Sequence, residues 1–461
     1  MTGRVKARVL KGFRDFLPQE ELRRGRLIRL LERHFASHGY MPIDTPALEY
    51  ADILLSKGGG ETDKQCYRFT DGGGRDVAMR FDLTVPLARF VASHWAELIM
   101  PFRRYHVGKV WRGENTQRGR FREFIQCDFD VVGSDSAGAD LEVMLMAIDG
   151  LSVIGGGALK LRFSHRGLFD LLLNGLNLID NNASVLRLVD KIGRIGSDRV
   201  RAMLVDLAGT KKTNVILDFI APESDNEKTL EKMIQCIENV NRLTGRLETE
   251  VGERQSDAGK QEAGELPALR VRMLLSAFDR LGLRDMLLLD PSITRGLDYY
   301  TGIVFEVFLK RLPGIGSVCS GGRYDNLTGF FQKKSISGVG ASIGLDRLLA
   351  GLRDLGINED AERNTDLLVL MLDEALLGDY QVFARDFRKL GLAVEVYPEP
   401  KKLEVQFRHA QARGIPFALL YGPREARKSR VNLKDLRTRK SFEALSINAA
   451  KAKLISELDN R

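Results

Sequence analysis

Residues 120 to 132 read Arg120-Phe-Arg-Glu-Phe-Ile-Gln-Cys-Asp-Phe-Asp-Val-Val132, and this stretch decides the fold because it describes a strand with two unlike faces. Side chains of a strand point alternately to its two sides. One side is mostly apolar and is expected to pack on a core; it carries Phe121, Glu123, Ile125, Cys127, Phe129 and Val131. The other side is almost entirely charged or amide; it carries Arg120, Arg122, Phe124, Gln126, Asp128 and Asp130. This pattern predicts an antiparallel sheet, and the simplest interpretation of the polar side is a face turned to solvent.

The segments around this strand predict its neighbours. Residues 102–114 form a second strand, joined to the first through the glycine-bearing loop 115–119. Upstream, residues 19–38 repeat apolar side chains at helical spacing, and the prolines in 41–46 favour an extended segment. Residues 65–80 predict a further strand pair around a glycine-rich turn. The N-terminal half therefore predicts a helix followed by antiparallel hairpins.

Three arginine-bearing motifs lie far apart in the sequence. They are Arg112-Gly-Glu114, Arg295-Gly-Leu-Asp-Tyr-Tyr300 and Gly344-Leu-Asp-Arg347. The second places a permanent positive charge beside two phenols and a carboxylate, a combination that is costly to bury without a polar, anionic partner. If the three motifs converge in space, they would form a polyphosphate pocket.

Composition limits the class of protein. A chain of 461 residues is too long for one ordinary core, so two or three domains are expected. No apolar run approaches the roughly 18–20 residues of a membrane span, and the N-terminus has no apolar segment typical of a secretory signal. The four cysteines are far apart and the six histidines show no metal-binding spacing. We therefore expect reduced thiols, a cytoplasmic location, and neither a protein-bound metal site nor a membrane partner.

The middle and the end of the chain differ in character. Helical patterns dominate from about 170 to 285 and predict an insertion between the strand regions; within them residues 245–267 are polar and glycine-bearing, which predicts a flexible loop. From about residue 365, strands and helices alternate and predict a small α/β domain with a mostly parallel sheet. The expected domains are thus residues 1–364, containing the insertion, and residues 365–461.

The C-terminal domain carries most of the chain's excess of positive over negative charge. From Asp366 onward it contains 18 Lys and Arg against 13 Asp and Glu, while the whole chain has a net charge of +8. Eight of these bases lie between Arg424 and Lys440. The run is either a solvated loop with an edge strand protected by charge, or a surface that contacts a phosphate backbone.

Taken together, these motifs resemble the class II aminoacyl-tRNA synthetases, and the histidyl-tRNA synthetase family in particular. The helix ending at Tyr40, followed by Pro46, resembles the family's dimer-interface motif. Residues 110–126 and 338–347 resemble its second and third motifs. The histidine-specific signals are residues 295–300 and Ser320-Gly-Gly-Arg-Tyr324. The resemblance implies an α+β catalytic domain with a six-stranded antiparallel sheet and flanking helices, a helical insertion, and a C-terminal anticodon-binding domain.

The resemblance also implies which residues bind ATP. Arg112 and Arg295 would hold the α-phosphate from opposite sides. Arg347 would stack on the adenine and reach the γ-phosphate, Arg120 would lie nearby, and Glu114 would contact the adenine amine. Arginines that neutralise the phosphate let a substrate carboxylate attack it without a protein nucleophile.

The remaining matches, together with Arg295, form an amino-acid pocket. Gln126 would face the carboxyl end of histidine, and Asp82 and Thr84 its α-amino group. The residues matched to the side-chain pocket are Asp130, Tyr299, Tyr300 and Tyr324, with Asp130 and Tyr300 at the two imidazole nitrogens. A carboxylate and a phenol at those nitrogens would distinguish imidazole from an apolar ring.

Three positions depart from the commonest pattern of the family. Asp82 and Asp130 stand where many bacterial members carry glutamate, and they match a variant common in eukaryotic members. Asp346 stands where the third motif usually has glutamate, which shortens the reach by one methylene. We expect these changes to shift contacts without loss of activity.

The resemblance implies a ligase that activates histidine with ATP and Mg²⁺ and transfers it to tRNA(His) as a homodimer. The alternative is a non-catalytic relative that serves as a regulatory subunit of histidine biosynthesis. Such relatives typically lack the C-terminal domain and several of the arginines. This chain has both, which favours the enzyme.

Overall fold

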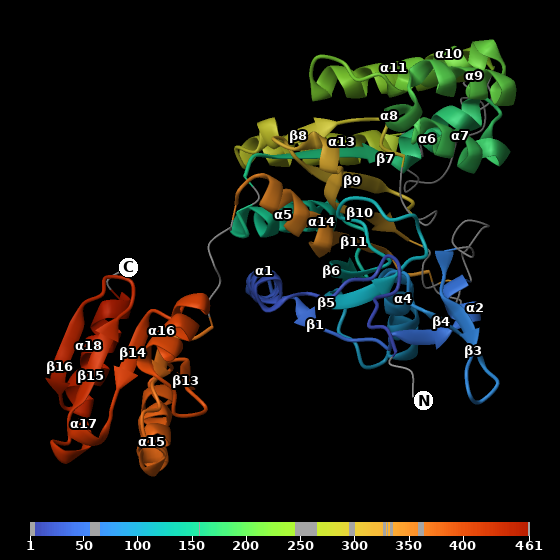
Figure 1. Ribbon diagram of the computed structural model, residues 1–461. Coiled ribbons are helices and arrows are strands. Elements are labelled where there is room, and N and C mark those ends of the chain that lie inside the picture. The colour runs from blue at the N-terminus through green and yellow to red at the C-terminus, as the bar shows by residue number, and fades with distance from the viewer. Residues whose placement is uncertain are drawn as a thin grey trace. The chain divides into compact units, whose positions relative to one another are not determined.

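The computed structural model describes residues 5–55, 65–155, 157–244, 265–294, 300–325, 329, 331, 335–357 and 364–459. Its contacts divide the chain into two compact units, coloured along the sequence in Figure 1. The first contains Met1–Asp15 with Arg26–Asn358, and the second contains Phe16–Gly25 with Glu359–Arg461.

The first unit is built on an eight-stranded sheet in the order β1-β5-β6-β11-β10-β9-β7-β8. The strands are β1 (Met41–Pro42), β5 (Phe102–Trp111), β6 (Glu123–Val132), β7 (Leu159–His165), β8 (Leu287–Leu289), β9 (Ile303–Leu309), β10 (Ser317–Tyr324) and β11 (Gly338–Gly344). The six central strands pair antiparallel throughout. The short edge strands β1 and β8 pair parallel to β5 and β7. The expected six-stranded antiparallel sheet is therefore confirmed, with one short parallel strand added at each edge.

Helices cover the apolar face of this sheet. They are α1 (Pro18–Ser37), α5 (Ala137–Val153) and α14 (Leu345–Asp354). The apolar side of β6 packs into this core, where the rings of Phe35 and Phe129 lie 5.1 Å apart between centroids. The predicted helix at residues 19–38 and the predicted apolar face of β6 are both confirmed.

The polar face of β6 was expected to meet solvent, and this interpretation is wrong. Gln126, Asp128 and Asp130 are only 8%, 2% and 3% exposed. Helix α4 (Thr84–Ser93) and the residues just before it lie over this end of the sheet, where Ala88 packs against Tyr324. Sequence alternation identified the face correctly but could not show that a distant segment covers it.

A small three-stranded sheet and a short helix complete the N-terminal region. The sheet has the order β2-β4-β3 and the elements are β2 (Leu48–Tyr50), α2 (Ala51–Leu55), β3 (Arg68–Thr70) and β4 (Asp76–Met79). The strand pair expected around the glycine turn is confirmed as β3 and β4, which pair antiparallel.

A helical region lies between β7 and β8 and gathers on one side of the sheet in Figure 1. Its helices are α6 (Arg166–Gly175), α7 (Asn182–Val189), α8 (Ile192–Ile195), α9 (Ser197–Ala208), α10 (Thr210–Ile220), α11 (Asn226–Leu243) and α13 (Glu265–Arg280). Of the segment 245–267 that predicts a flexible loop, residues 245–264 lie outside the described residues. Residues 265–267 begin α13, so the loop prediction is wrong there.

The C-terminal unit has a five-stranded sheet in the order β13-β12-β14-β15-β16. Its elements are β12 (Leu367–Val369), α15 (Leu377–Arg388), β13 (Val394–Val396), α16 (Leu403–Ala412), β14 (Phe417–Leu420), α17 (Pro423–Arg427), β15 (Val431–Asp435), β16 (Ser441–Leu445) and α18 (Ile447–Asp459). Strands β13, β12 and β14 are parallel, as expected, but β15 and β16 are antiparallel. Strand β15, which lies within the basic run between Arg424 and Lys440, is inside the sheet, and the edge strands β13 and β16 both lie outside that run.

Among the residues that the structure describes, no helix is both long and apolar enough to cross a membrane.

Candidate active site

The hairpin of β5 and β6 presents the first arginine motif, Arg112-Gly-Glu114, in the loop that joins its two strands. Arg112 follows β5, and its Nε donates to the carbonyl oxygen of Phe81 at 2.8 Å. Its guanidinium lies 5.2 Å from the ring centroid of Phe124. Glu114 lies 3.5 Å from Arg120 across the loop between the strands. The hairpin therefore holds two arginines and a carboxylate beside the polar face of β6.

These residues line a cavity of about 150 Å³ that also includes the third motif. Arg347, at the start of α14, enters it and donates from Nη1 to the carbonyl oxygen of Ser317 at 2.7 Å. Four of the five residues predicted to contact ATP meet here with Gln126: they are Arg112, Glu114, Arg120 and Arg347. Two of the three arginine motifs thus converge in space, which is part of the condition set above for a polyphosphate pocket.

The second arginine motif, residues 295–300, is described only at its last residue. Arg295 and Tyr299 lie outside the described residues, so their predicted roles stay predictions. Tyr300 is described, and its ring packs against Gly322 of β10. A Cβ atom added to Gly322 would lie 2.8 Å from that ring.

Sequence reasoning missed Arg14. Its Nη2 lies 2.5 Å from Oδ1 of Asp346, and its guanidinium lies 4.1 Å from the centroid of Phe121, which lines the cavity. The other oxygen of Asp346 accepts from the backbone N–H of Ile125 at 3.0 Å. The shorter acid of the third motif is therefore held by β6 and by the N-terminal segment, a contact 332 residues apart that no local pattern announces.

Gln126 lies between the arginine-lined cavity and a second, buried group of side chains. Its Nε2 donates to Ser342 Oγ at 2.8 Å. Its buried Oε1 has no hydrogen-bond partner among the described residues. Leaving a buried amide oxygen without a partner costs free energy, so this oxygen is suited to accept a hydrogen bond from a substrate group.

The second group contains three buried carboxylates. Asp82 precedes α4 and accepts from the N–H of Val85 at 3.1 Å, and Thr84 is the first residue of that helix. Asp128 and Asp130 come from β6. Burial raises the pKa of Asp82 to about 6 and that of Asp128 to about 7, and it also raises the pKa of Asp130. The site therefore favours uncharged or cation-paired acids.

Asp130 is held on both oxygens. Oδ1 accepts from the hydroxyl of Tyr324 at 2.5 Å, and Oδ2 lies 2.5 Å from Nη2 of Arg104. Arg104 is fully buried and lies directly across from Asp130 in the register of β5 and β6. The sequence analysis did not select Arg104, although this register is the signal that could have identified it.

Glycines make room for these side chains. A Cβ on Gly340 would lie 1.9 Å from Oδ1 of Asp130, and one on Gly338 would lie 2.3 Å from the ring of Tyr324. Any larger residue at these positions of β11 would displace the groups that form the pocket. The floor of this pocket is therefore set by residues that have no side chain.

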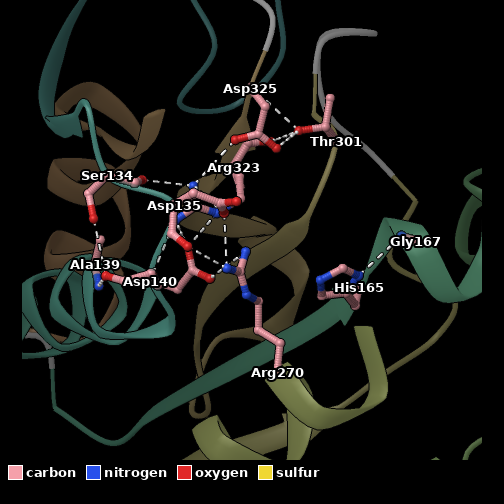
Figure 2. Close-up of polar contacts among 11 residues, drawn as sticks. Ser134, Asp135, Ala139, Asp140, His165, Gly167, Arg270, Thr301, Arg323 and Asp325 are labelled. Atoms are coloured by element: carbon pink, nitrogen blue, oxygen red, sulfur yellow. Dashed lines mark hydrogen bonds and ion pairs between the residues drawn. The ribbon is translucent and has the colours of Figure 1, made fainter. Parts of the chain in front are cut away.

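A salt-bridge network anchors the strand that carries Tyr324. On the opposite side of β10, Arg323 is 1% exposed and donates from Nη2 to Oδ1 of Asp140 at 2.6 Å. Figure 2 shows Arg270, from α13, approaching the same carboxylate, at 3.6 Å from its Oδ2. At the other end of this network, the hydroxyl of Thr301 donates to Asp325 at 2.6 Å. The network joins α5, α13 and the end of β10.

The antiparallel sheet, the arginine-lined cavity and the adjoining acidic pocket define a class II aminoacyl-tRNA synthetase. Residues 12–348 match the histidyl-tRNA synthetase family and residues 366–457 match the anticodon binding domain. The chain belongs to the histidyl-tRNA synthetase family.

Individual relatives agree over nearly the full length. The histidine–tRNA ligase of Treponema denticola is 46% identical, covering 98% of each chain, and that of Rhodopirellula baltica is 42% identical, covering 95% of each. The crystal structure of histidyl-tRNA synthetase from Nostoc sp. PCC 7120 is similar with a TM-score of 0.82 and 28% identity, covering 98% of this chain and 100% of that one. A Bacillus halodurans protein described as an ATP phosphoribosyltransferase regulatory subunit/histidyl-tRNA synthetase has a TM-score of 0.71 at 22% identity over 88% of this chain and 97% of that one, and shares the fold.

Proposed function

We propose that the chain activates L-histidine with ATP to form histidyl-adenylate and then transfers the histidyl group to the 3′ end of tRNA(His). The observation that carries this proposal is the meeting of an arginine-lined cavity and a buried carboxylate pocket at Gln126. An adenylate-forming enzyme needs these two environments side by side, because the carboxylate of the amino acid must reach the α-phosphate.

In the ATP half, Arg112 and Arg295 neutralise the α-phosphate, and Arg347 supports the adenine and the γ-phosphate. Arg120 and Glu114 lie at the same cavity, with Glu114 toward the adenine amine. The histidine carboxylate attacks the α-phosphorus, the bond to the β-phosphate oxygen breaks, and pyrophosphate leaves. The arginines lower the barrier because they stabilise the charge that accumulates on the phosphate.

In the histidine half, Asp82 and Thr84 receive the α-ammonium group and Gln126 orients the carboxylate. Asp130 and Tyr300 bind the imidazole nitrogens, with Tyr299 and Tyr324 closing the pocket. The ion pair of Asp130 with Arg104 supports this role, since it favours the ionised form of the carboxylate as an acceptor.

Magnesium enters with the substrate as the ATP complex. Asp346, one carboxylate at the cavity, already binds Arg14 and Ile125, and Glu114 lies near Arg120. The cavity therefore presents arginines toward phosphate, and we propose that the ion is held chiefly by the phosphates, whose charge it neutralises.

The domains of the chain indicate its binding partners. Residues 365–461 are proposed as the anticodon-binding domain, and residues 1–364, with the insertion at about 170–285, as the catalytic domain.

We propose a homodimer formed through residues 33–46, where Met41 is 62% exposed on the edge strand β1. A fully active monomer at micromolar concentration would exclude that dimer. A cytoplasmic location is proposed from the four cysteines, all of which are free.

ATP–pyrophosphate exchange measured with each of the twenty amino acids tests the function. We expect exchange with histidine alone. Exchange with another amino acid would overturn the specificity. Histidine binding without exchange would instead indicate a regulatory protein that senses histidine.

A further inference from the structure

Asp128 is a third carboxylate in the proposed histidine pocket, and the roles given above do not use it. It is 2% exposed, and its Oδ1 has no hydrogen-bond partner among the described residues. Its side chain is on the same face of β6 as Gln126 and Asp130, and a hydrogen bond from Ser342 reaches it. A buried carboxylate oxygen of this kind needs either a proton or a cation.

The groups that face Asp128 come from every neighbouring element. They are Arg80 and Asp82 from the segment between β4 and α4, Arg104 and His106 from β5, Asp130 from β6, Cys319 from β10, Ser342 from β11, and Tyr300. Burial keeps His106 neutral by lowering its pKa to about 4, and it raises the pKa values of Cys319 and Tyr300, which keeps both uncharged. Among the described residues, the charged neighbours of Asp128 are therefore two guanidiniums and two carboxylates.

Both cations have another partner, although Nε and Nη1 of Arg104 have no hydrogen-bond partner among the described residues. Arg104 pairs with Asp130 at 2.5 Å. Arg80 donates to the carbonyl oxygens of Thr45 and Lys109 and lies 3.7 Å from Asp44. The α-ammonium group of bound histidine would neutralise Asp82. Within the described part of the chain no cationic side chain forms an ion pair with Asp128, although the charge of Arg104 acts on it, and the imidazole ring of bound histidine can fill that place.

We propose that Asp128 is a further histidine-binding residue whose carboxyl group and the substrate imidazole share one proton, so that histidine binding above neutral pH takes up one proton from solvent. This inference rests on the proposed function, since it assumes that histidine occupies the pocket. The proton lies either on the carboxyl group, donating to a ring nitrogen, or on the ring, forming an ion pair. The net charge of the pocket is the same in both forms.

The pKa values of the Asp128 carboxyl group and of imidazole are close enough for the two groups to share one proton. Burial raises the pKa of Asp128 to about 7, and imidazole has an ordinary pKa of about 6.5. At pH 8 both free partners are deprotonated, and the bound pair requires one proton. Linkage then predicts that histidine affinity falls by up to about tenfold for each pH unit above about 8.

The test is calorimetric titration of the full-length protein with L-histidine at pH 8, in buffers of different ionisation enthalpy. The heats give the number of protons taken up per histidine bound. Wild type should take up close to one. Asp128→Asn should take up about one fewer, because the amide cannot hold the proton, and its affinity should depend less on pH. Any contribution from the α-amino group of histidine is common to both proteins.

Asp44→Asn is the matched control. It removes a carboxylate from the same cluster, 2.9 Å from His106, but the Asp44 side chain is 86% exposed and lies outside the pocket. It should keep the proton uptake of wild type. Equal uptake by wild type and Asp128→Asn would overturn the proposal.

Wild type alone also decides the question if Asp128→Asn does not fold. Histidine binding to wild type at pH 8 with no proton uptake would reject the shared proton and leave the proposed function intact. Failure of histidine to bind wild type at all would reject both.

Discussion

The two halves of the active site handle charge in opposite ways. In the ATP half, the side chains of Arg120 and Glu114 are about one-third exposed, at 33% and 32%. In the histidine half, Arg104 and Asp130 are 0% and 3% exposed and are held 2.5 Å apart. Charges near solvent can change partners as substrates arrive, whereas buried charges need fixed partners before the substrate enters. The difference predicts that burial, more than charge itself, sets the size of each mutational effect.

The largest effect is expected where burial is complete. Arg104→Met should lower the free energy of unfolding by about 3–5 kcal/mol, because it leaves buried Asp130 without its cation. Urea unfolding measures this change. Arg103→Met is the matched control: Arg103 pairs with Glu142 at 2.7 Å, but its side chain is 37% exposed. That substitution should cost about 0–1 kcal/mol. Equal losses would show that burial does not separate the two arginines.

In the ATP half, the expected loss is in catalysis and not in stability. Arg112→Ala should reduce ATP–pyrophosphate exchange by about 10²–10³-fold, the effect of losing one donor to a developing oxyanion. Histidine binding and urea unfolding should change little, because the contacts of Arg112 are to a backbone oxygen and an aromatic ring. Arg295→Ala should also reduce exchange strongly, and it should leave histidine binding weakened but measurable. Near-normal exchange in either variant would remove that arginine from the proposed mechanism.

A smaller effect tests the shape of the histidine half without changing its charge. Gly340→Ala places a methyl group at 1.9 Å from Asp130 Oδ1, so the carboxylate must move. We expect histidine binding to weaken by about 1–3 kcal/mol, the usual range for overpacking. Histidine titration measures it, and Gly314→Ala, with no atom within 4 Å of the added carbon, is the control. Unchanged affinity would show that the glycine floor is not needed.

The smallest effect is expected for exposed charges outside the site. Arg427 and Lys428 are exposed at the end of α17. If they contact tRNA phosphates, Arg427→Ala/Lys428→Ala should reduce the salt slope of tRNA binding by roughly one unit per contact. Arg385→Ala/Lys389→Ala, at the end of α15 in the same unit, is the control pair. Reduced solubility with an unchanged salt slope would favour the account in which these bases only protect the chain from association.

The ATP half could be predicted from the sequence more fully than the histidine half. Its arginines stand in short motifs, and the cavity brings Arg112, Glu114, Arg120 and Arg347 together as expected. Arg104 and Asp128 were missed because burial is not a local property: Arg103 and Arg104 are adjacent and identical in type, yet one side chain is 37% exposed and the other fully buried. Arg14 was missed because its partner is 332 residues away.

The fold likewise contains elements that the sequence predicts and elements that it does not. Strands β5 and β6 and the helix α1 have clear sequence periods, and these elements lie close to where the sequence predicts them. The short parallel strands β1 and β8 have two and three residues, too few for a period to be read. The covering of the polar face of β6 depends on α4, whose position relative to the sheet is set by tertiary packing and not by its own sequence.

The bond between Arg14 and Asp346 has a consequence for the order in which the protein is made. Its two ends are separated by 332 residues, so the contact cannot form until nearly the whole first unit has left the ribosome. At translation rates of about 5–20 residues per second, Arg14 waits roughly 15–70 seconds for its partner. The N-terminal segment is among the first parts to be synthesised and among the last to be fixed, so a nascent chain emerges for most of its synthesis without a finished nucleotide site.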